Sequence, residues 1–285
     1  ASLNLTGFCE LKTMGDTPIT SGAAMRPEDG NHPLFLWRLK TLTSTVYLAG
    51  SLHLSKASLY PLPAAYESAF AKSKKLVVEV NTRALNPRDI YAKTEAAARL
   101  NLQRYLRESF NAADYAQLAL TTSEYGVPLR ALQSYKPAMI YTKLSVMGFL
   151  ALGYETRFGL EEYFLKQKSS EDILQLETMD LQLQYLFNQS MEMQIAVLMD
   201  TVAQFKDIET TASHLIRAWT HGDDETLAEL MLARPETPKL VKQFNKKILD
   251  QRNVTMSEKI FAYLDTTETY FILVGAAHLA GTNSI

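Results

Sequence analysis

The chain has little cysteine and no long apolar run, and each shortage excludes a class of protein. Cys9 is the only cysteine among 285 residues. An intrachain disulfide, a Cys-x-x-Cys redox motif and a zinc finger are therefore excluded. No uninterrupted apolar stretch reaches the roughly 18–20 residues that a membrane-spanning helix requires. The sequence accordingly predicts no transmembrane segment.

An excess of either charge is also missing. The chain has 29 basic and 31 acidic residues, and its formal net charge is −2. Such a balance provides no basic surface for nucleic acid or for an anionic membrane. A hydrophobic content of 47% and a charged content of 21% are typical of a globular protein. At this length the chain can bury a sizeable core, while nothing in it indicates an oligomeric state.

The first 33 residues differ in composition from the rest. Few large apolar side chains stand among their Gly, Pro, Thr and Asp residues, so we expect a weakly structured lead-in over 1–33 and a single domain over 34–285. The first residue is Ala1 rather than methionine, which is consistent with a signal peptide that has been removed. We therefore expect a periplasmic or secreted protein, and a cytoplasmic location stays open.

The first part of the domain reads as strands around a helix. Residues 34–40 and 45–49 are rich in β-branched and aromatic side chains and predict a hairpin. A helix is expected over 59–73 and a buried strand over 76–80. The second strand, this helix and the third strand form a βαβ unit, whose right-handed crossover places both strands in one parallel sheet.

The remainder is mainly helical. Apolar residues recur at three- and four-residue spacing over about 87–233, with a short strand expected over 173–177. A long helix over 238–264 and a last strand over 270–274 complete the pattern. The sequence therefore predicts an α/β fold, in which a central mixed β-sheet is flanked by helices. A large helical insertion or cap lies between its N-terminal and C-terminal strands.

The most informative pattern is a repeated one, in which an apolar strand runs into Gly-x-x-His. It occurs at residues 50–53 and again at 275–278, although the chain has only five histidines. If the two strands pair in one sheet, His53 and His278 emerge at the same edge, where open α/β sheets hold their ligands. The repeat predicts a metal or acid–base site assembled from both ends of the sequence.

Glu79 is the next candidate, because it interrupts the apolar run 76–80. A carboxylate there is costly unless it is paired or bound to a metal, although a strand with one polar face would explain it equally well. Two neutral imidazoles and a carboxylate form a familiar set of ligands for a divalent ion. The carboxylate could equally be the general base that activates a water molecule.

Three further charged residues have both a functional and an ordinary interpretation. Glu161 follows Gly159 at an expected helix start, where it is either a ligand or a carboxylate that suits the helix dipole. Glu177 closes a short strand and either supports the site or lies on the surface. Arg252 could stabilise a developing oxyanion or form a surface ion pair.

Together with the segments between them, these motifs resemble the TraB/GumN family, which is related to the Tiki proteases. The resemblance runs from about Phe35 to Gly281. The segments that carry it are, in chain order, 35–38, 47–53, 59–63, 76–80, 159–161, 176–178, 251–253 and 274–279. It implies an α/β fold shared with erythromycin esterases and with a haem-binding iron-uptake protein.

The resemblance also implies a metal-dependent hydrolase of the Tiki branch, in which paired Gly-x-x-His motifs and a glutamate are essential. By position, the metal ligands are His53, His278, Glu79 and Glu161, and the catalytic groups are Glu79, Glu161 and Arg252. Tiki enzymes cleave peptide bonds near the amino terminus of a secreted signal protein. They favour manganese or cobalt over zinc, so a divalent metal ion and a peptide or protein substrate are implied.

Two other functions stay open. TraB-type members shut off a peptide pheromone, which a non-enzymatic binder of a peptide or haem could achieve without cleavage. An esterase-like hydrolase could instead use His53 as a metal-free general base. The resemblance further implies a helix and a strand beyond the second histidine. Their absence from this sequence could leave the sheet edge, and the site, incomplete.

Overall fold

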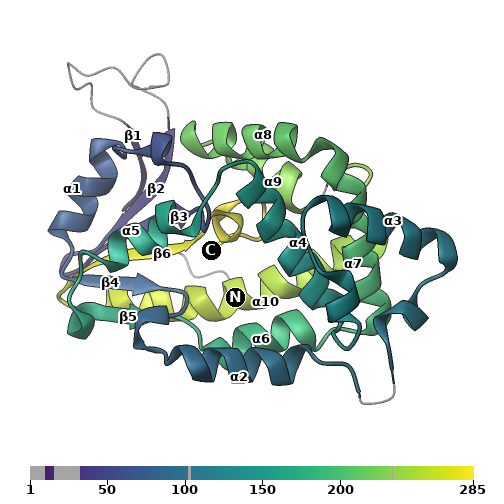
Figure 1. Cartoon of the computed structure of the whole chain (residues 1–285). Coiled ribbons are helices and arrows are strands. Elements are labelled where there is room, and N and C mark those ends of the chain that lie inside the picture. The colour runs from purple at the N-terminus through teal and green to yellow at the C-terminus, as the bar shows by residue number, and fades with distance from the viewer. Residues whose placement is uncertain (1–9, 16–32, 102–103, 233) are drawn as a thin grey trace.

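The strand β6 (Thr269–Gly275) occupies an interior position in a mixed sheet of six strands (Figure 1). The computed structural model describes residues 10–15, 33–101, 104–232 and 234–285. The strand order is β1-β2-β3-β6-β4-β5. The other strands are β1 (Glu10–Gly15), β2 (Pro33–Lys40), β3 (Thr45–Ser51), β4 (Lys75–Val78) and β5 (Ile173–Gln175).

Ten helices are defined in these ranges: α1 (Ala64–Lys72), α2 (Pro87–Ala98), α3 (Ala112–Glu124), α4 (Pro137–Ala151), α5 (Leu160–Leu165), α6 (Met179–Phe187), α7 (Met191–Gln204), α8 (Ile208–Thr220), α9 (Asp224–Leu232) and α10 (Lys239–Leu264). In the described part of the chain, no helix has both the length and the apolar character needed to cross a membrane.

The sheet is parallel where the two Gly-x-x-His strands meet. β6 pairs with β3 on one side and with β4 on the other, both in parallel orientation. Residues 270–275 are all buried, as expected for a strand covered on both faces. The predicted hairpin is confirmed as the antiparallel pair β2–β3. β3 and β4 lie in one parallel sheet as predicted, with β6 inserted between them.

Helices cover both faces of this sheet. Adjacent residues of a strand point to opposite faces, so Tyr270 and Phe271 mark the two sides. Phe271 contacts Phe70 of α1 and Phe164 of α5. Tyr270 instead stacks on Tyr263 of α10, with ring centroids 4.4 Å apart. α1 and α5 therefore pack on one face and α10 on the other.

The buried apolar residues form two clusters, which we call the sheet cluster and the helical cluster. The sheet cluster surrounds β3, β4 and β6, and the helical cluster joins α3, α4 and α7. α10 belongs to both, because Val241 and Phe244 lie in the helical cluster and Met256 and Ile260 in the sheet cluster. The α/β fold with a helical insertion is thus confirmed, and α10 connects its two parts.

Two boundaries differ from the sequence-based expectation. The strand β1 lies inside the expected lead-in, of which the remainder falls outside the described residues. The range 87–233 is also not one continuous cap, because α5 and β5 pack with the sheet. Leu160, Phe164 and Ile173 belong to the sheet cluster. The spacing of apolar residues predicts whether a segment is a helix or a strand. It does not predict whether the segment packs in the sheet cluster or in the helical cluster.

β6, the strand that leads to His278, is not at an edge, so the sheet is not left open at this strand. β3 and β4 flank it along its length. The segment after the histidine also returns to it, since the backbone N–H of Ile285 donates to the carbonyl oxygen of His278 at 2.9 Å.

Trp219 of α8 provides a test of how the helices are held on the sheet. Its indole N–H donates to the carbonyl oxygen of Gly50 at 2.8 Å, and the side chain is 2% exposed. Replacing Trp219 by Phe removes this buried hydrogen bond, so we expect the free energy of unfolding in urea to fall by about 1–3 kcal/mol. Trp37→Phe is the matched control, because its indole has no hydrogen-bond partner among the residues that the structure describes. Equal losses in the two variants would contradict this role.

Candidate active site

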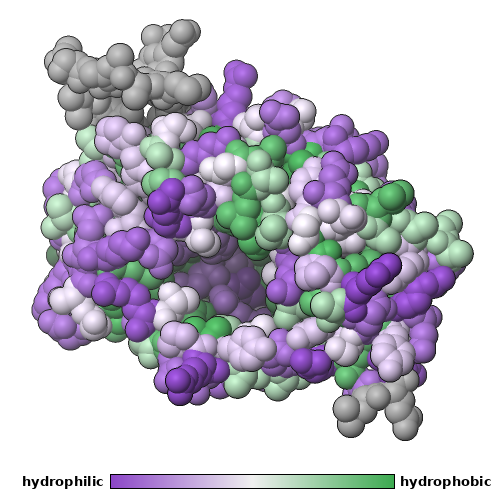
Figure 2. Space-filling model, in the orientation of Figure 1, coloured by the Kyte–Doolittle hydropathy of each residue, from purple (hydrophilic) through white to green (hydrophobic). Residues whose placement is uncertain are grey.

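A pocket opens at the carboxyl ends of the parallel strands. Figure 2 shows a hollow with a hydrophilic floor near the middle of one face, over the region where β4 and β6 end in Figure 1. The pocket measures about 460 Å³. Its charged and polar lining comes from His53, Glu79, Glu161, Glu162, Gln182 and Arg252, and its apolar lining from Val78, Leu165, Tyr185, Leu186 and Ile248. Residues far apart in the sequence therefore face one space.

The two histidines reach this edge in different environments. The register pairs Ser51 with Gly275, so the two Gly-x-x-His motifs are offset by one residue. His53 lies in the loop after β3, and its side chain is 62% exposed. His278 lies in the short 3₁₀ helix η8 (Ala276–Leu279), and its side chain is only 4% exposed. The same local motif thus delivers one histidine to solvent and the other to the interior.

Glu161 fixes the orientation of His53. Its Oε1 lies 2.7 Å from Nδ1 of His53 and also accepts a hydrogen bond from the hydroxyl of Ser51. Nδ1 is therefore occupied, and Nε2 is left for the pocket. Oε2 of Glu161 is buried and has no hydrogen-bond partner among the described residues. Ser51 was not anticipated from the sequence as part of the site.

Gly159 explains why Glu161 approaches so closely. A Cβ at this position would overlap the carbonyl oxygen of His53. The next residue, Leu160, donates its backbone N–H to the carbonyl oxygen of Leu52 at 3.1 Å. The glycine therefore allows the start of α5 to pack directly on the backbone of the first motif, which places Glu161 beside His53.

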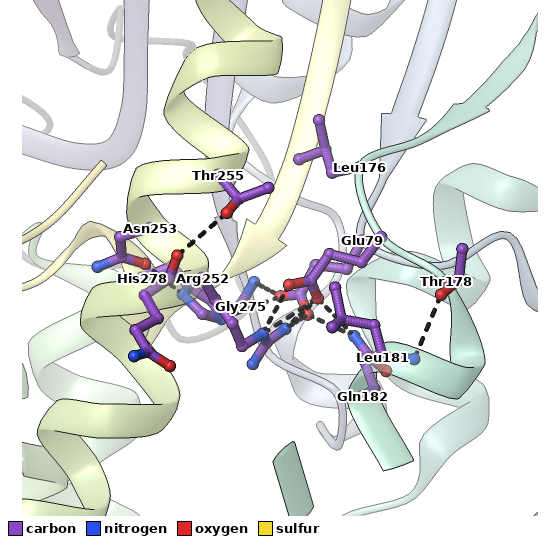
Figure 3. Close-up of polar contacts among 12 residues, drawn as sticks. Glu79, Leu176, Thr178, Leu181, Gln182, Arg252, Asn253, Thr255, Gly275 and His278 are labelled. Atoms are coloured by element: carbon purple, nitrogen blue, oxygen red, sulfur yellow. Dashed lines mark hydrogen bonds and ion pairs between the residues drawn. The ribbon is translucent and has the colours of Figure 1, made fainter. Parts of the chain in front are cut away.

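Glu79 lies one residue beyond β4 and has both carboxylate oxygens engaged (Figure 3). Oε1 accepts the backbone N–H of Gly275 at 2.7 Å. Oε2 accepts from Arg252 Nη2 at 2.5 Å and from Gln182 Nε2 at 3.1 Å. The carboxylate that interrupts the apolar run is thus paired, as the cost of burying it requires.

Arg252 joins Glu79 to a second buried carboxylate. Its Nε and Nη2 both donate to Glu177, at 2.7–3.1 Å, and the side chain of Glu177 is fully buried. Of the two interpretations of Arg252, the surface ion pair is wrong, because the Arg252 side chain is only 14% exposed. Nη1 has no acceptor among the described residues, and Arg252 is one of the residues that line the pocket. Glu177 supports the site, which was one of its two interpretations.

The side chains of three residues meet above Gly275. A Cβ on this residue would lie 3.2 Å from Glu79 Oε1, 3.5 Å from His53 Nε2 and 3.7 Å from His278 Cδ2. His278 Nε2 is 3.7 Å from Glu79 Oε1. The structure therefore brings together His53, Glu79 and His278, with Glu161 behind His53 and Arg252 behind Glu79.

The charges in this cluster shift the pKa values of its members. The Glu161 carboxylate, more than that of Glu79, raises the pKa of His53 to about 9. Burial lowers the pKa of His278 to about 4 against the opposing pull of Glu79. Burial alone would raise the pKa of Glu79, but His278, Arg252 and His53 together lower it to about 2. The ionised carboxylates make the space above Gly275 favourable for a cation.

The donor set suits a divalent cation. Among the described residues, no three His, Cys, Asp or Glu side chains are already drawn together as a metal site. Even so, Glu79 Oε1 and His278 Nε2 are 3.7 Å apart, close to the roughly 3.4 Å that separates two ligands of a tetrahedral ion. The space that a Cβ of Gly275 would fill and the unpartnered Oε2 of Glu161 agree with this fit.

Fold and site together define an α/β protein with a histidine–glutamate–arginine cluster at the carboxyl edge of its parallel strands. The model of the TraB/PrgY/gumN family matches residues 35–285, and the chain belongs to this family. No curated protein and no solved structure matches the chain. The family resemblance predicted from the ordered motifs is therefore confirmed over nearly the whole chain.

The ion cluster of Arg252 predicts a large stability effect. Arg252→Met leaves Glu79 and Glu177 without their shared cation, and we expect the free energy of unfolding to fall by about 3–5 kcal/mol. Urea denaturation measures the change. Arg157→Met is the matched control, because Arg157 pairs with Glu155 at the exposed surface and should cost less than about 1 kcal/mol. Similar values for the two variants would show that the buried cluster does not stabilise the fold.

Gly275→Ala tests whether the three groups meet at this residue. The backbone of Gly275 has φ −52° and admits alanine, so the effect should come from the methyl group pressing on Glu79 and His53. We expect a loss of about 1–3 kcal/mol in unfolding free energy, as for overpacking. The side-chain NMR signals of His53 and His278 should shift at the same time. Histidine signals that stay in place would contradict the arrangement.

Proposed function

We propose that this protein is a metal-dependent hydrolase that cleaves peptide bonds. The observation that supports this most strongly is the convergence of His53, Glu79 and His278 above Gly275, with His53 and Glu79 also lining an open pocket. A hydrolase requires a polarised carbonyl, an activated water and a place for the proton. The residues around this point offer a group for each task.

In this proposal Nε2 of His53, after loss of its proton, Nε2 of His278 and Oε1 of Glu79 would hold the cation. When bound, a divalent cation polarises a carbonyl oxygen and acidifies a water molecule. Glu161 keeps His53 in orientation through Nδ1, which is the usual task of a carboxylate behind a metal-ligating histidine. Arg252 and Gln182 hold the other oxygen of Glu79 in place.

The two glutamates differ in their capacity to take a proton. Both oxygens of Glu79 accept hydrogen bonds, whereas Oε2 of Glu161 has no partner among the described residues. We therefore assign the proton-accepting role to Glu161 and the ligand role to Glu79. Nη1 of Arg252 is the guanidinium nitrogen left to hold a carbonyl oxygen of the substrate as charge develops on it.

A peptide fits the pocket in size and character. Its volume of about 460 Å³ suits a segment of a few residues, and one wall is apolar while the floor is charged. The resemblance to the Tiki proteases agrees with a peptide or protein substrate. Because the Tiki proteases act on a secreted signal protein, the proposal includes a periplasmic or secreted location.

Metal analysis and peptide cleavage test the proposal together. Protein purified without chelator, or reconstituted with Mn²⁺, Co²⁺ or Zn²⁺, should retain ~1 cation per chain and shorten members of a peptide library analysed by mass spectrometry. His53→Ala and His278→Ala should lower cation affinity by at least the roughly 10–100-fold that loss of an outer partner costs. His214→Ala, in the exposed part of α8, is the control. A protein that retains no cation after reconstitution refutes the metal-dependent function.

A metal-free hydrolase is the second candidate, because His53 is exposed and its Nδ1 contacts the half-buried carboxylate of Glu161. This arrangement is typical of a histidine that serves as general base. Cleavage that survives exhaustive chelation and is abolished by His53→Ala, but not by His278→Ala, would favour it. Peptide or haem that is retained without cleavage would instead favour a binding protein.

A further inference from the structure

We infer that Asn253 is a positioning residue for His278: its amide fixes the ring proton on Nδ1 and so presents Nε2 to Glu79 and to the cation. This inference rests on the proposed function for the role of His278. Asn253 follows Arg252 on α10 and is 5% exposed. His278 is 3% exposed, so neither side chain has solvent as an alternative partner.

The orientation of the Asn253 amide follows from its second contact. Its Nδ2 lies 2.7 Å from the backbone carbonyl oxygen of Asn283, which can only accept a hydrogen bond. The amide NH₂ must therefore face Asn283, and Oδ1 must face the histidine. Oδ1 is 2.6 Å from Nδ1 of His278. Because a carbonyl oxygen can only accept, Nδ1 carries the proton.

The opposite side of the ring faces a competing acceptor. Nε2 of His278 lies 3.7 Å from Glu79 Oε1, which is too long for a hydrogen bond but close enough to attract a proton to Nε2. Without the Asn253 amide, the nearest acceptor in contact with the ring would be this carboxylate. The proton would then occupy the nitrogen that has to bind the cation. Asn253 therefore stabilises the tautomer of His278 with the proton on Nδ1, whereas Glu79 would favour the tautomer with the proton on Nε2.

The segment after the histidine holds the amide in place. Asn283 provides the carbonyl that orients Asn253, and the N–H of Ile285 donates to the carbonyl oxygen of His278 at 2.9 Å. The side chain of Asn283 is not needed for this, since it faces outward and donates to Asp250 at 3.1 Å in an exposed contact. Backbone and side chain of Asn283 therefore have separable roles.

Nitrogen-15 NMR of the histidine side chains in the metal-free full chain tests the inference directly. In the unmodified protein, we expect the proton of His278 on Nδ1, with Nε2 unprotonated. In Asn253→Leu the proton should move to Nε2, and affinity for Mn²⁺ in calorimetry should fall about 10–100-fold. Asn253→Asp keeps an acceptor at Nδ1 and should preserve the tautomer. Asn283→Ala keeps the orienting carbonyl and should behave like the unmodified protein.

The outcomes separate this inference from the proposed function. A proton on Nε2 in the unmodified protein overturns the inference without any variant, even if Asn253→Leu fails to fold. An unchanged tautomer in Asn253→Leu overturns it as well. The tautomer of His278 could change as expected while neither the unmodified protein nor any variant binds Mn²⁺, Zn²⁺ or Co²⁺. In that case the positioning role of Asn253 stands and the metal-dependent function is refuted.

Discussion

The buried ion cluster of Glu79, Arg252 and Glu177 is the constraint on which the rest of the site depends. Each residue comes from a different part of the fold. Glu79 follows β4, Glu177 lies two residues after β5, and Arg252 is in the middle of α10. Buried charges are tolerated only when partners with good geometry surround them, so this cluster holds three elements in one arrangement. Oε2 of Glu79 is fixed by Arg252, and Oε1 is thereby held at the N–H of Gly275. The position of Glu79 between the two histidines follows from these bonds.

The two copies of Gly-x-x-His acquire different properties because they fold differently after their glycines. His278 enters a 3₁₀ turn that buries it against α10, whereas His53 stays in a loop and meets Glu161 at the start of α5. Without a cation, pKa values of about 4 and about 9 leave His278 neutral and His53 protonated at neutral pH, so His53 has to release a proton before its Nε2 can bind a cation.

The parts of this structure that could be predicted are those that local patterns encode. Apolar runs identified β3, β4 and β6, and the repeated Gly-x-x-His placed both histidines at one sheet edge. The lateral order, with β6 between β3 and β4, depends on contacts between residues more than 190 positions apart, which periodicity does not encode. Glu177 and Asn253 occur in sequence contexts as ordinary as those of surface residues. Only the tertiary contacts with Arg252 and His278 give them a role, and for the same reason Arg252 could be read as a surface charge.

The helix α10 positions side chains on two sides of the site. Successive helical residues point about 100° apart, so Arg252 faces the carboxylates while Asn253 faces His278. The helix has apolar anchors on either side of this pair: Phe244 lies in the helical cluster and Met256 in the sheet cluster. Both residues are therefore positioned by the packing of the whole insertion against the sheet and not by the motif strands alone. Because close-packed interiors transmit small displacements, a shift of the helical cluster reaches Glu79 and His278 through two adjacent side chains. The geometry of the site thus depends on the distant helices, although none of the Gly-x-x-His residues lies on them.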